Sequence, residues 1–311
     1  AETRPLCDKF QTTDLRSRCQ QVEDRGGCKT RKLQYTCAQG ANMDEDIEPL
    51  SSNAPARRGD LDAGEALVKS QMYAAYLSHV LVLAIIITVG IWVSDEAMGG
   101  GGVSWSQGDA KRVFNWHPVL MVTAFSFMTI ASLAFRAPYR CADRRATKAM
   151  HGTQWAVASI CAIVGITAVV KSHNDPVSGY IANLYSLHSW VGIAVIILYS
   201  CQFIAGVMAF ALDMEFITPS MRANLLLLHK YVGPFVYNAT ALTIMLGIQE
   251  KEGFIGCGYK VETVDSIPIT HFFDIPAVCR TGHALGLLVF ILALCTSYAL
   301  HDFGRENIRS Y

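Results

Sequence analysis

The sequence predicts an all-α membrane protein of six transmembrane helices, preceded by a small extramembrane segment that contains cysteines. Hydrophobic residues make up 51% of the 311 residues, and charged residues only 17%. Six separate apolar segments each approach the ~20 residues that a helix needs to cross the hydrocarbon layer. Lys and Arg together number 26, as do Asp and Glu, so the charge balance gives no support to a nucleic-acid partner.

The N-terminal extension, residues 1–70, contains no apolar run long enough to cross a bilayer. Its four cysteines are Cys7, Cys19, Cys28 and Cys37. Their spacings do not match the short C-x2-4-C pairs of structural zinc sites, and two disulfides that staple a small helical hairpin fit better. Such disulfides conflict with a reducing inner side, which leaves open an inverted topology or an unusual compartment. The stretch "SSNAPARRGD" is typical of a linker, so we divide the chain into residues 1–70 and 71–311.

The six spans follow this linker. We expect them at Met72–Val93, His117–Phe135, Met150–Val170, Ser186–Leu212, Leu225–Ile248 and Gly282–Leu300. The loop "FRAPYRCADRRATKAM" between the second and third spans carries five basic residues against the single acid Asp143. By the positive-inside rule this loop faces the cytosol or an equivalent compartment, and both chain ends then lie on the same inner side. We therefore expect a multi-pass protein of a lipid bilayer, in an organelle or endomembrane.

Four histidines lie near the ends of the middle four spans. His117 and His188 head spans that enter from the outer side, whereas His151 and His229 lie early in spans that enter from the inner side. The four residues therefore form two pairs at two depths. A single intramembrane histidine is more often a hydrogen-bonded residue between helices or part of a proton path.

Two matched pairs fit metal ligation better than four isolated structural roles. Zinc would require further Cys, His or carboxylate ligands at the same depth, and these spans offer few. Haem requires only two axial ligands, so two bis-histidine haems account for the whole pattern. Nearby glycines, Gly152, Gly192 and Gly233, would leave room for a macrocycle or serve close helix packing. We interpret His79 and His283, which lack partners at a matching depth, as structural.

The segments "FNWHPVLM", "TKAMHG", "NLYSLHSWVG" and "ATALTIMLGIQEK" resemble the cytochrome b561 family of transmembrane electron carriers. The resemblance extends in order from about Ala74 to Ser297. It implies a six-helix bundle whose middle four helices hold two haems b, with His117 paired to His188 and His151 paired to His229. It also implies an ascorbate-dependent oxidoreductase that passes electrons from ascorbate on one side to monodehydroascorbate or a ferric chelate on the other.

The resemblance also implies ascorbate contacts at both faces. Inner candidates are the cations Lys148 and Arg222, with Arg136, Arg140 and Arg145 as additions. These cations could instead only fix the topology, which is the role that we expect for Arg144. Outer candidates come from "KSHND" and a nearby tyrosine: Lys171, His173, Asn174 and Tyr185.

Cys257 and Cys279 share the loop between the last two spans, on the outer side. An oxidising compartment there would favour one disulfide that pins this loop, although two idle thiols are the alternative.

The sequence thus predicts transmembrane electron transfer from an inner donor to an outer acceptor. Because histidines fill both axial positions, the haems would relay electrons and bind no ligand at iron. The alternative is a haem-containing accessory subunit of a larger respiratory or photosynthetic complex, with the N-terminal extension and the long outer loop as docking surfaces. A homodimer or a larger membrane complex is compatible with either hypothesis.

Overall fold

The computed structural model describes residues 58–94, 96, 101–136, 143–212, 214–257, 263–264, 267–268 and 275–301. The disulfides predicted among the four N-terminal cysteines, and the candidate Arg140, lie outside these residues. Within the described part, six helices are long and apolar enough to cross a membrane. The prediction of six spans in an all-α bundle is therefore confirmed.

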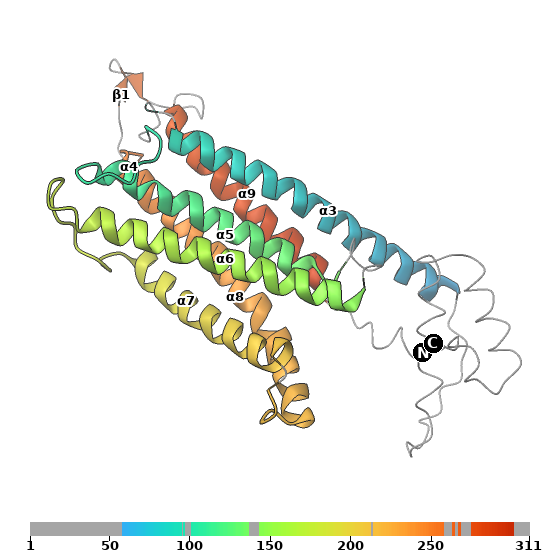
Figure 1. Ribbon diagram of the computed structural model, residues 1–311. Coiled ribbons are helices and arrows are strands. Elements are labelled where there is room, and N and C mark those ends of the chain that lie inside the picture. The colour runs from blue at the N-terminus through green and yellow to red at the C-terminus, as the bar shows by residue number, and fades with distance from the viewer. Residues whose placement is uncertain are drawn as a thin grey trace, which may run out of the picture. The chain divides into compact units, whose positions relative to one another are not determined.

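Figure 1 shows the helices in their order along the chain. They are α3 (Arg58–Ser94), α4 (Ala110–Phe114), α5 (Trp116–Leu133), α6 (Arg144–His173), α7 (Leu187–Gly206) with its π-helical continuation η4 (Val207–Ala211), α8 (Pro219–Phe254) and α9 (Ala277–Leu300). Two strands of two residues each, β1 (Thr263–Val264) and β2 (Ile267–Pro268), pair antiparallel between α8 and α9.

The first span is longer than its apolar segment. Helix α3 contains 37 residues and begins at Arg58, well before the predicted start at Met72. At 1.5 Å per residue it is about 55 Å long, whereas the hydrocarbon core of a bilayer is about 30 Å thick. Because residues 58–70 are largely polar, they extend this helix beyond the apolar layer.

Side-chain caps set where α6, α7 and α8 begin. Asp143 accepts hydrogen bonds from backbone N–H groups at the start of α6, and Thr218 does so at the start of α8. Ser186 and Ser189 form a reciprocal capping box at the start of α7. Such caps satisfy N–H groups that have no partner inside the helix. The caps fix the residue at which each helix begins, and with it the position of the nearby histidine along the helix.

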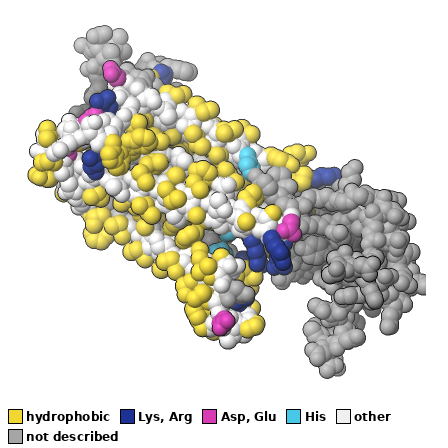
Figure 2. Space-filling view, viewed as in Figure 1, with side chains coloured by type: hydrophobic (Ala, Val, Ile, Leu, Met, Phe, Trp, Pro, Cys, Tyr) yellow, Lys and Arg dark blue, Asp and Glu magenta, His cyan; other side chains and the backbone are white. Residues whose placement is uncertain are grey.

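The bundle is built from three helix pairs. Helix α3 packs along α9, α5 along α6, and α7 along α8 (Figure 1). The main core joins α3, α5, α8 and α9 through buried apolar side chains such as Trp92, Phe125, Tyr237, Leu285 and Val289. Helices α6 and α7 bury the smallest share of their residues. Apolar side chains cover the flank of the bundle in Figure 2, as a surface in contact with lipid requires.

We name the two ends of the bundle after the orientation that the loop charges predict. Among the described residues, the inner end carries residues 134–136, 143 and 214–218, and the outer end carries residues 101–109, 174–186, 255–257 and 275–276. Basic side chains gather at the inner end, where α6 begins (Figure 2).

Cys257 and Cys279 form a disulfide at the outer end, with their Cα atoms 5.7 Å apart. The bond joins the chain just after α8 to the first turn of α9, so the predicted pinning of this loop is confirmed. Among the described cysteines, Cys161, Cys201 and Cys295 are free thiols in the spanning helices.

Candidate functional site

His117 and His188 face each other at the outer end of the bundle. Their ring centres are 6.0 Å apart and their ring planes are inclined by 81°. His117 lies in the first turn of α5 and His188 in the first turn of α7. The structure thus brings together the two residues that the sequence assigned to the outer depth.

His151 and His229 face each other nearer the inner end. Their ring centres are 6.2 Å apart and their planes are inclined by 65°. Aromatic side chains surround the pair: Phe135 and Trp155 lie 5.3 and 6.0 Å from the His151 ring, and Phe210 lies 5.8 Å from the His229 ring. Helices α6 and α8 supply the two imidazoles.

Three of the four imidazoles donate a hydrogen bond from Nδ1 to a backbone carbonyl of a neighbouring helix. These bonds are His117 to Gly165 at 3.1 Å, His188 to Thr243 at 2.9 Å and His151 to Ala131 at 2.8 Å. A proton on Nδ1 leaves a lone pair on Nε2, the atom that can then bind a metal. The hydrogen bonds also hold each ring in one orientation.

The geometry of both pairs fits axial coordination of an iron by two imidazoles. With metal–nitrogen bonds of about 2 Å, one metal between two such rings places the ring centres about 6 Å apart. Within the described residues, no three His, Cys, Asp or Glu side chains come together as a zinc site would require. Two nitrogens per site match the donor set of a bis-histidine haem, in which the macrocycle provides the other four ligands.

Two glycines approach these histidines closely, and the sequence analysis did not single them out. A Cβ atom at Gly247 would lie 2.7 Å from Cε1 of His188, and one at Gly206 would lie 3.3 Å from Cε1 of His229. Any larger residue at position 247 would therefore displace the His188 ring. No local pattern marks these contacts, because each joins two different helices.

At the three glycines singled out in the sequence, an added Cβ atom would have more space. A Cβ atom at Gly152 would meet nothing within 4 Å. At Gly192 and Gly233 it would make ordinary contacts of 3.6 and 3.5 Å with Thr243 and Gln202.

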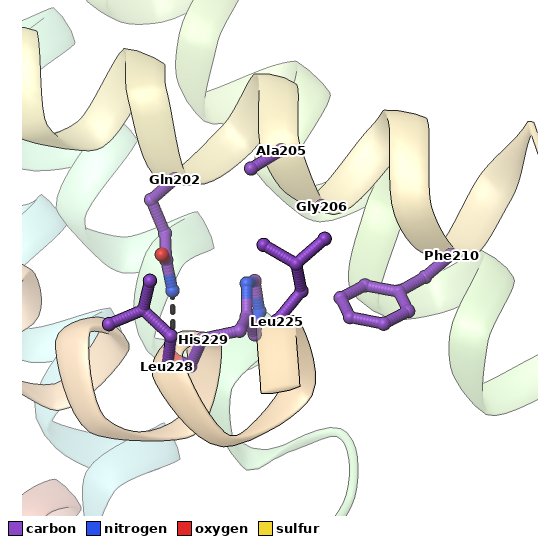
Figure 3. A pocket seen from close by; sticks show the side chains of 7 residues that line it. All are labelled: Gln202, Ala205, Gly206, Phe210, Leu225, Leu228 and His229. Carbon is purple, nitrogen blue, oxygen red and sulfur yellow. Dashed lines mark hydrogen bonds between the residues drawn. The ribbon is translucent and has the colours of Figure 1, made fainter. Parts of the chain in front are cut away.

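A small pocket opens beside His229 between α8 and the end of α7 (Figure 3). Its lining is Gln202, Ala205, Gly206, Phe210, Leu225, Leu228 and His229. The Gln202 amide donates to the His229 carbonyl at 2.8 Å, which ties the two helices together. The π-helical turn η4 carries Phe210 to the pocket, and such turns often occur at functional sites. The walls are mostly apolar, as a macrocycle edge requires.

At the outer end, the structure connects two candidate residues to the outer pair. The His173 ring lies parallel to the Phe114 ring with centres 6.5 Å apart, and 6.3 Å from the ring of Tyr185. Phe114 in turn lies 5.9 Å from the His117 ring. Phe114, which joins this aromatic cluster to His117, was not predicted as a site residue from the sequence.

The remaining outer candidates have protein partners. The Lys171 ammonium lies 5.8 Å from the ring centre of Trp105. The Asn174 amide donates to the Val170 carbonyl at 2.8 Å and ends α6, with its side chain exposed. Burial and the Glu250 carboxylate raise the pKa of the Tyr185 hydroxyl, which therefore stays protonated at neutral pH.

The inner candidates lie on the first turns of two helices. Lys148 and Arg145 are exposed near the start of α6, one and two turns before His151. Arg222 is half-buried in the first turn of α8. Arg136 donates from Nη2 to the Leu300 carbonyl at 2.6 Å, a bond that caps the end of α9.

The two histidines that we interpreted as structural, His79 and His283, have protein partners. His79 donates from Nδ1 to the Ala75 carbonyl at 2.7 Å within α3. His283 lies 3.6 Å from a carboxylate oxygen of Glu252.

Comparison with known proteins assigns the family. The family model for eukaryotic cytochrome b561 matches residues 116–255, a range that includes all four paired histidines. The plasma membrane ascorbate-dependent reductase CYBRD1 of Rattus norvegicus is 36% identical over 228 residues, 72% of this chain and 70% of the relative. The lysosomal membrane ascorbate-dependent ferrireductase CYB561A3 of Mus musculus is 33% identical over 209 residues, 66% of this chain and 81% of the relative. The chain belongs to the cytochrome b561 family.

Proposed function

We propose that this protein carries electrons across a membrane from ascorbate at the inner end to monodehydroascorbate or ferric iron at the outer end. The relatives are named ascorbate-dependent reductase and ascorbate-dependent ferrireductase, which supports this donor and this acceptor class. The six apolar helices and these relatives make the chain a multi-pass integral membrane protein. Membership of the family implies b haem.

We further propose two haems, one on His117 and His188 and one on His151 and His229. The observation that carries this proposal is the spacing of the two pairs, 6.0 and 6.2 Å between ring centres at two depths of the bundle. When bound, the haems supply one-electron carriage. The two histidines of each pair would hold the haem iron and would leave no position on it for oxygen or substrate.

Aromatic side chains pack between the two pairs. Tyr237 is fully buried, its ring lies 4.8 Å from that of Phe125, and its hydroxyl is hydrogen-bonded to Thr129 at 2.9 Å. Trp155 and Tyr199 form a second aromatic contact, with ring centres 5.5 Å apart. Close packing of this kind leaves little room for water between the outer and inner sites.

At the inner end, cationic side chains would collect the donor. Ascorbate is a monoanion at neutral pH, and Lys148, Arg145 and Arg222 offer fixed positive charge at the end of the bundle nearest the His151 pair. At the outer end, His173 and Tyr185 would meet the acceptor, since their rings reach His117 through Phe114.

The accessory-subunit hypothesis finds less support. The relatives are named as reductases in their own right, and a donor site and an acceptor site can both be assigned to residues of this chain.

The test is reduction of the purified, haem-loaded protein in detergent by ascorbate alone. We expect the reduced b-haem spectrum to appear on addition of ascorbate and to decay on addition of a ferric chelate. A protein that dithionite reduces but ascorbate leaves oxidised would contradict the proposed donor and favour the accessory role.

A further inference from the structure

Lys251 is a buried lysine near the outer end of α8, with only 6% of its surface exposed. Its ammonium donates a hydrogen bond of 3.0 Å to the side-chain oxygen of Asn115, which is itself fully buried. The ammonium also lies over two aromatic rings, 5.4 Å from the centre of Trp92 and 5.6 Å from that of Phe114. The site therefore holds a cation away from water.

Lys251 makes no salt bridge with any carboxylate in the described part of the chain. The two nearest acids along α8 have other partners: Glu250 accepts from the Ser186 hydroxyl at 2.9 Å, and Glu252 lies 3.6 Å from His283. An amide oxygen and two aromatic faces compensate a buried ammonium only in part. Among the described residues, therefore, no carboxylate neutralises the positive charge of Lys251, which lies in a region of low dielectric constant.

One intermediate residue connects Lys251 to each histidine of the outer pair: Phe114 to His117, and Gly247 to His188. Phe114, whose ring contacts the ammonium, is 5.9 Å from the ring of His117. Gly247 precedes Lys251 by one turn on the same face of α8, and a Cβ atom at Gly247 would touch the His188 ring. Among the cations near the inner pair, Lys148 and Arg145 are exposed and screened by solvent, and Arg222 is only half-buried, whereas Lys251 is buried.

We propose that Lys251 raises the reduction potential of the outer haem above that of the inner haem and so gives electron flow its outward direction. The inference rests on the proposed function, because it requires a haem at His117 and His188. An added electron is stabilised by a fixed positive charge, and the stabilisation is largest where solvent does not screen it. Lys251 acts on the outer site through its electric field and touches no substrate. It would therefore tune the reduction potential and is not a catalytic residue.

The test uses the full-length protein loaded with haem, in the variants Lys251→Met and Lys251→Gln. Both substitutions remove the charge at similar length, and Gln keeps a hydrogen-bonding group toward Asn115. Lys111→Gln is the matched control, because Lys111 is a lysine at the same end with an exposed side chain. The readout is a spectroelectrochemical titration that resolves the two haems, repeated in a His151→Ala background that keeps the outer histidine pair intact.

In both neutral variants, we expect the ratio of reduced to oxidised outer haem at a fixed ambient potential to fall about three- to tenfold, where tenfold corresponds to 59 mV for one electron. The inner haem should keep its potential, and Lys111→Gln should shift the potential of the outer haem less than either Lys251 variant, because the Lys111 charge is exposed to solvent. High salt should leave the difference in place, because a buried charge is poorly screened.

Unchanged potentials in both neutral variants would overturn the inference, as would equal shifts of both haems. Loss of the outer haem from both variants would also overturn it, because Lys251 would then be a residue of the fold alone. Failure of the proposed function has a different signature: wild-type protein that binds fewer than two haems per chain.

Discussion

The ring centres of His117 and His188 lie 6.0 Å apart, across the interface between two helix pairs. His117 belongs to the α5–α6 pair and His188 to the α7–α8 pair, and His151 and His229 bridge the same two helix pairs at 6.2 Å. The proposed haems would therefore occupy one seam of the bundle. This arrangement makes the residues that line the seam the most sensitive to substitution.

Gly247 is the most sensitive position in this seam. Gly247→Ala places a methyl group 2.7 Å from Cε1 of His188, so we expect loss of the outer haem with the inner haem retained. Overpacking of this kind costs about 1–3 kcal/mol. Gly253→Ala, later in the same helix, is the control, because its Cβ atom would meet nothing within 4 Å. Equal haem content in the two variants would show that the close approach is unimportant.

The inner cations are expected to govern donor binding. Lys148→Gln and Arg222→Gln should keep both haems but slow reduction by ascorbate, since losing one hydrogen bond to a charged ligand costs about 1.5–3 kcal/mol. Reduction by dithionite should not change, because dithionite does not need this site. High ionic strength should reproduce part of the defect in the wild type.

Arg144→Gln is the matched control for these variants, because we expect Arg144 only to fix topology. If ascorbate reduced Lys148→Gln and Arg222→Gln as fast as Arg144→Gln at every salt concentration, the assignment of Lys148 and Arg222 to an inner ascorbate site would be wrong.

The six spans could be predicted from the sequence because hydrophobicity is a local property. The four paired histidines could be predicted because their depth follows from where each span begins. The contact of Gly247 with His188, the stacking of Phe114 on His173 and the burial of Lys251 could not. Each of these depends on how two helices pack, which one sequence does not encode locally.

The disulfide between Cys257 and Cys279 should stabilise the outer loop. It closes a loop with a sequence separation of 22 residues, and in the chain-entropy model a loop of this size contributes about 3 kcal/mol. We expect Cys257→Ser with Cys279→Ser to lower the thermal midpoint of the haem-loaded protein. Mild reductant should have the same effect on the wild type and none on the double variant. A midpoint that reductant leaves unchanged would contradict this role.

Asp175 should make the outer loops sensitive to acid. Its carboxylate accepts from the N–H groups of Val177 at 2.9 Å and Gly108 at 2.6 Å, and these hydrogen bonds lower its pKa. Because the folded pKa lies below the unfolded value of about 3.9, the stabilisation is complete above that pH. It is lost as the pH falls through the folded pKa.

Hydrogen exchange at the Gly108 amide checks this expectation. After correction for the intrinsic exchange rate, the wild type should lose protection below about pH 4, and Asp175→Asn should be weakly protected at every pH. Equal protection of the two proteins at neutral pH would contradict the role of this carboxylate.

The central claim, two haems on two separate histidine pairs, is tested most directly by the ratio of haem to protein in the wild type, His117→Ala and His151→Ala. We expect about two haems per chain in the wild type, because each site takes two axial histidines. Each variant should retain about one haem, since each should empty only its own site. The haem that remains in His117→Ala should differ in spectrum or potential from the haem that remains in His151→Ala. A wild-type ratio near one, or loss of all haem from either single variant, would contradict the account.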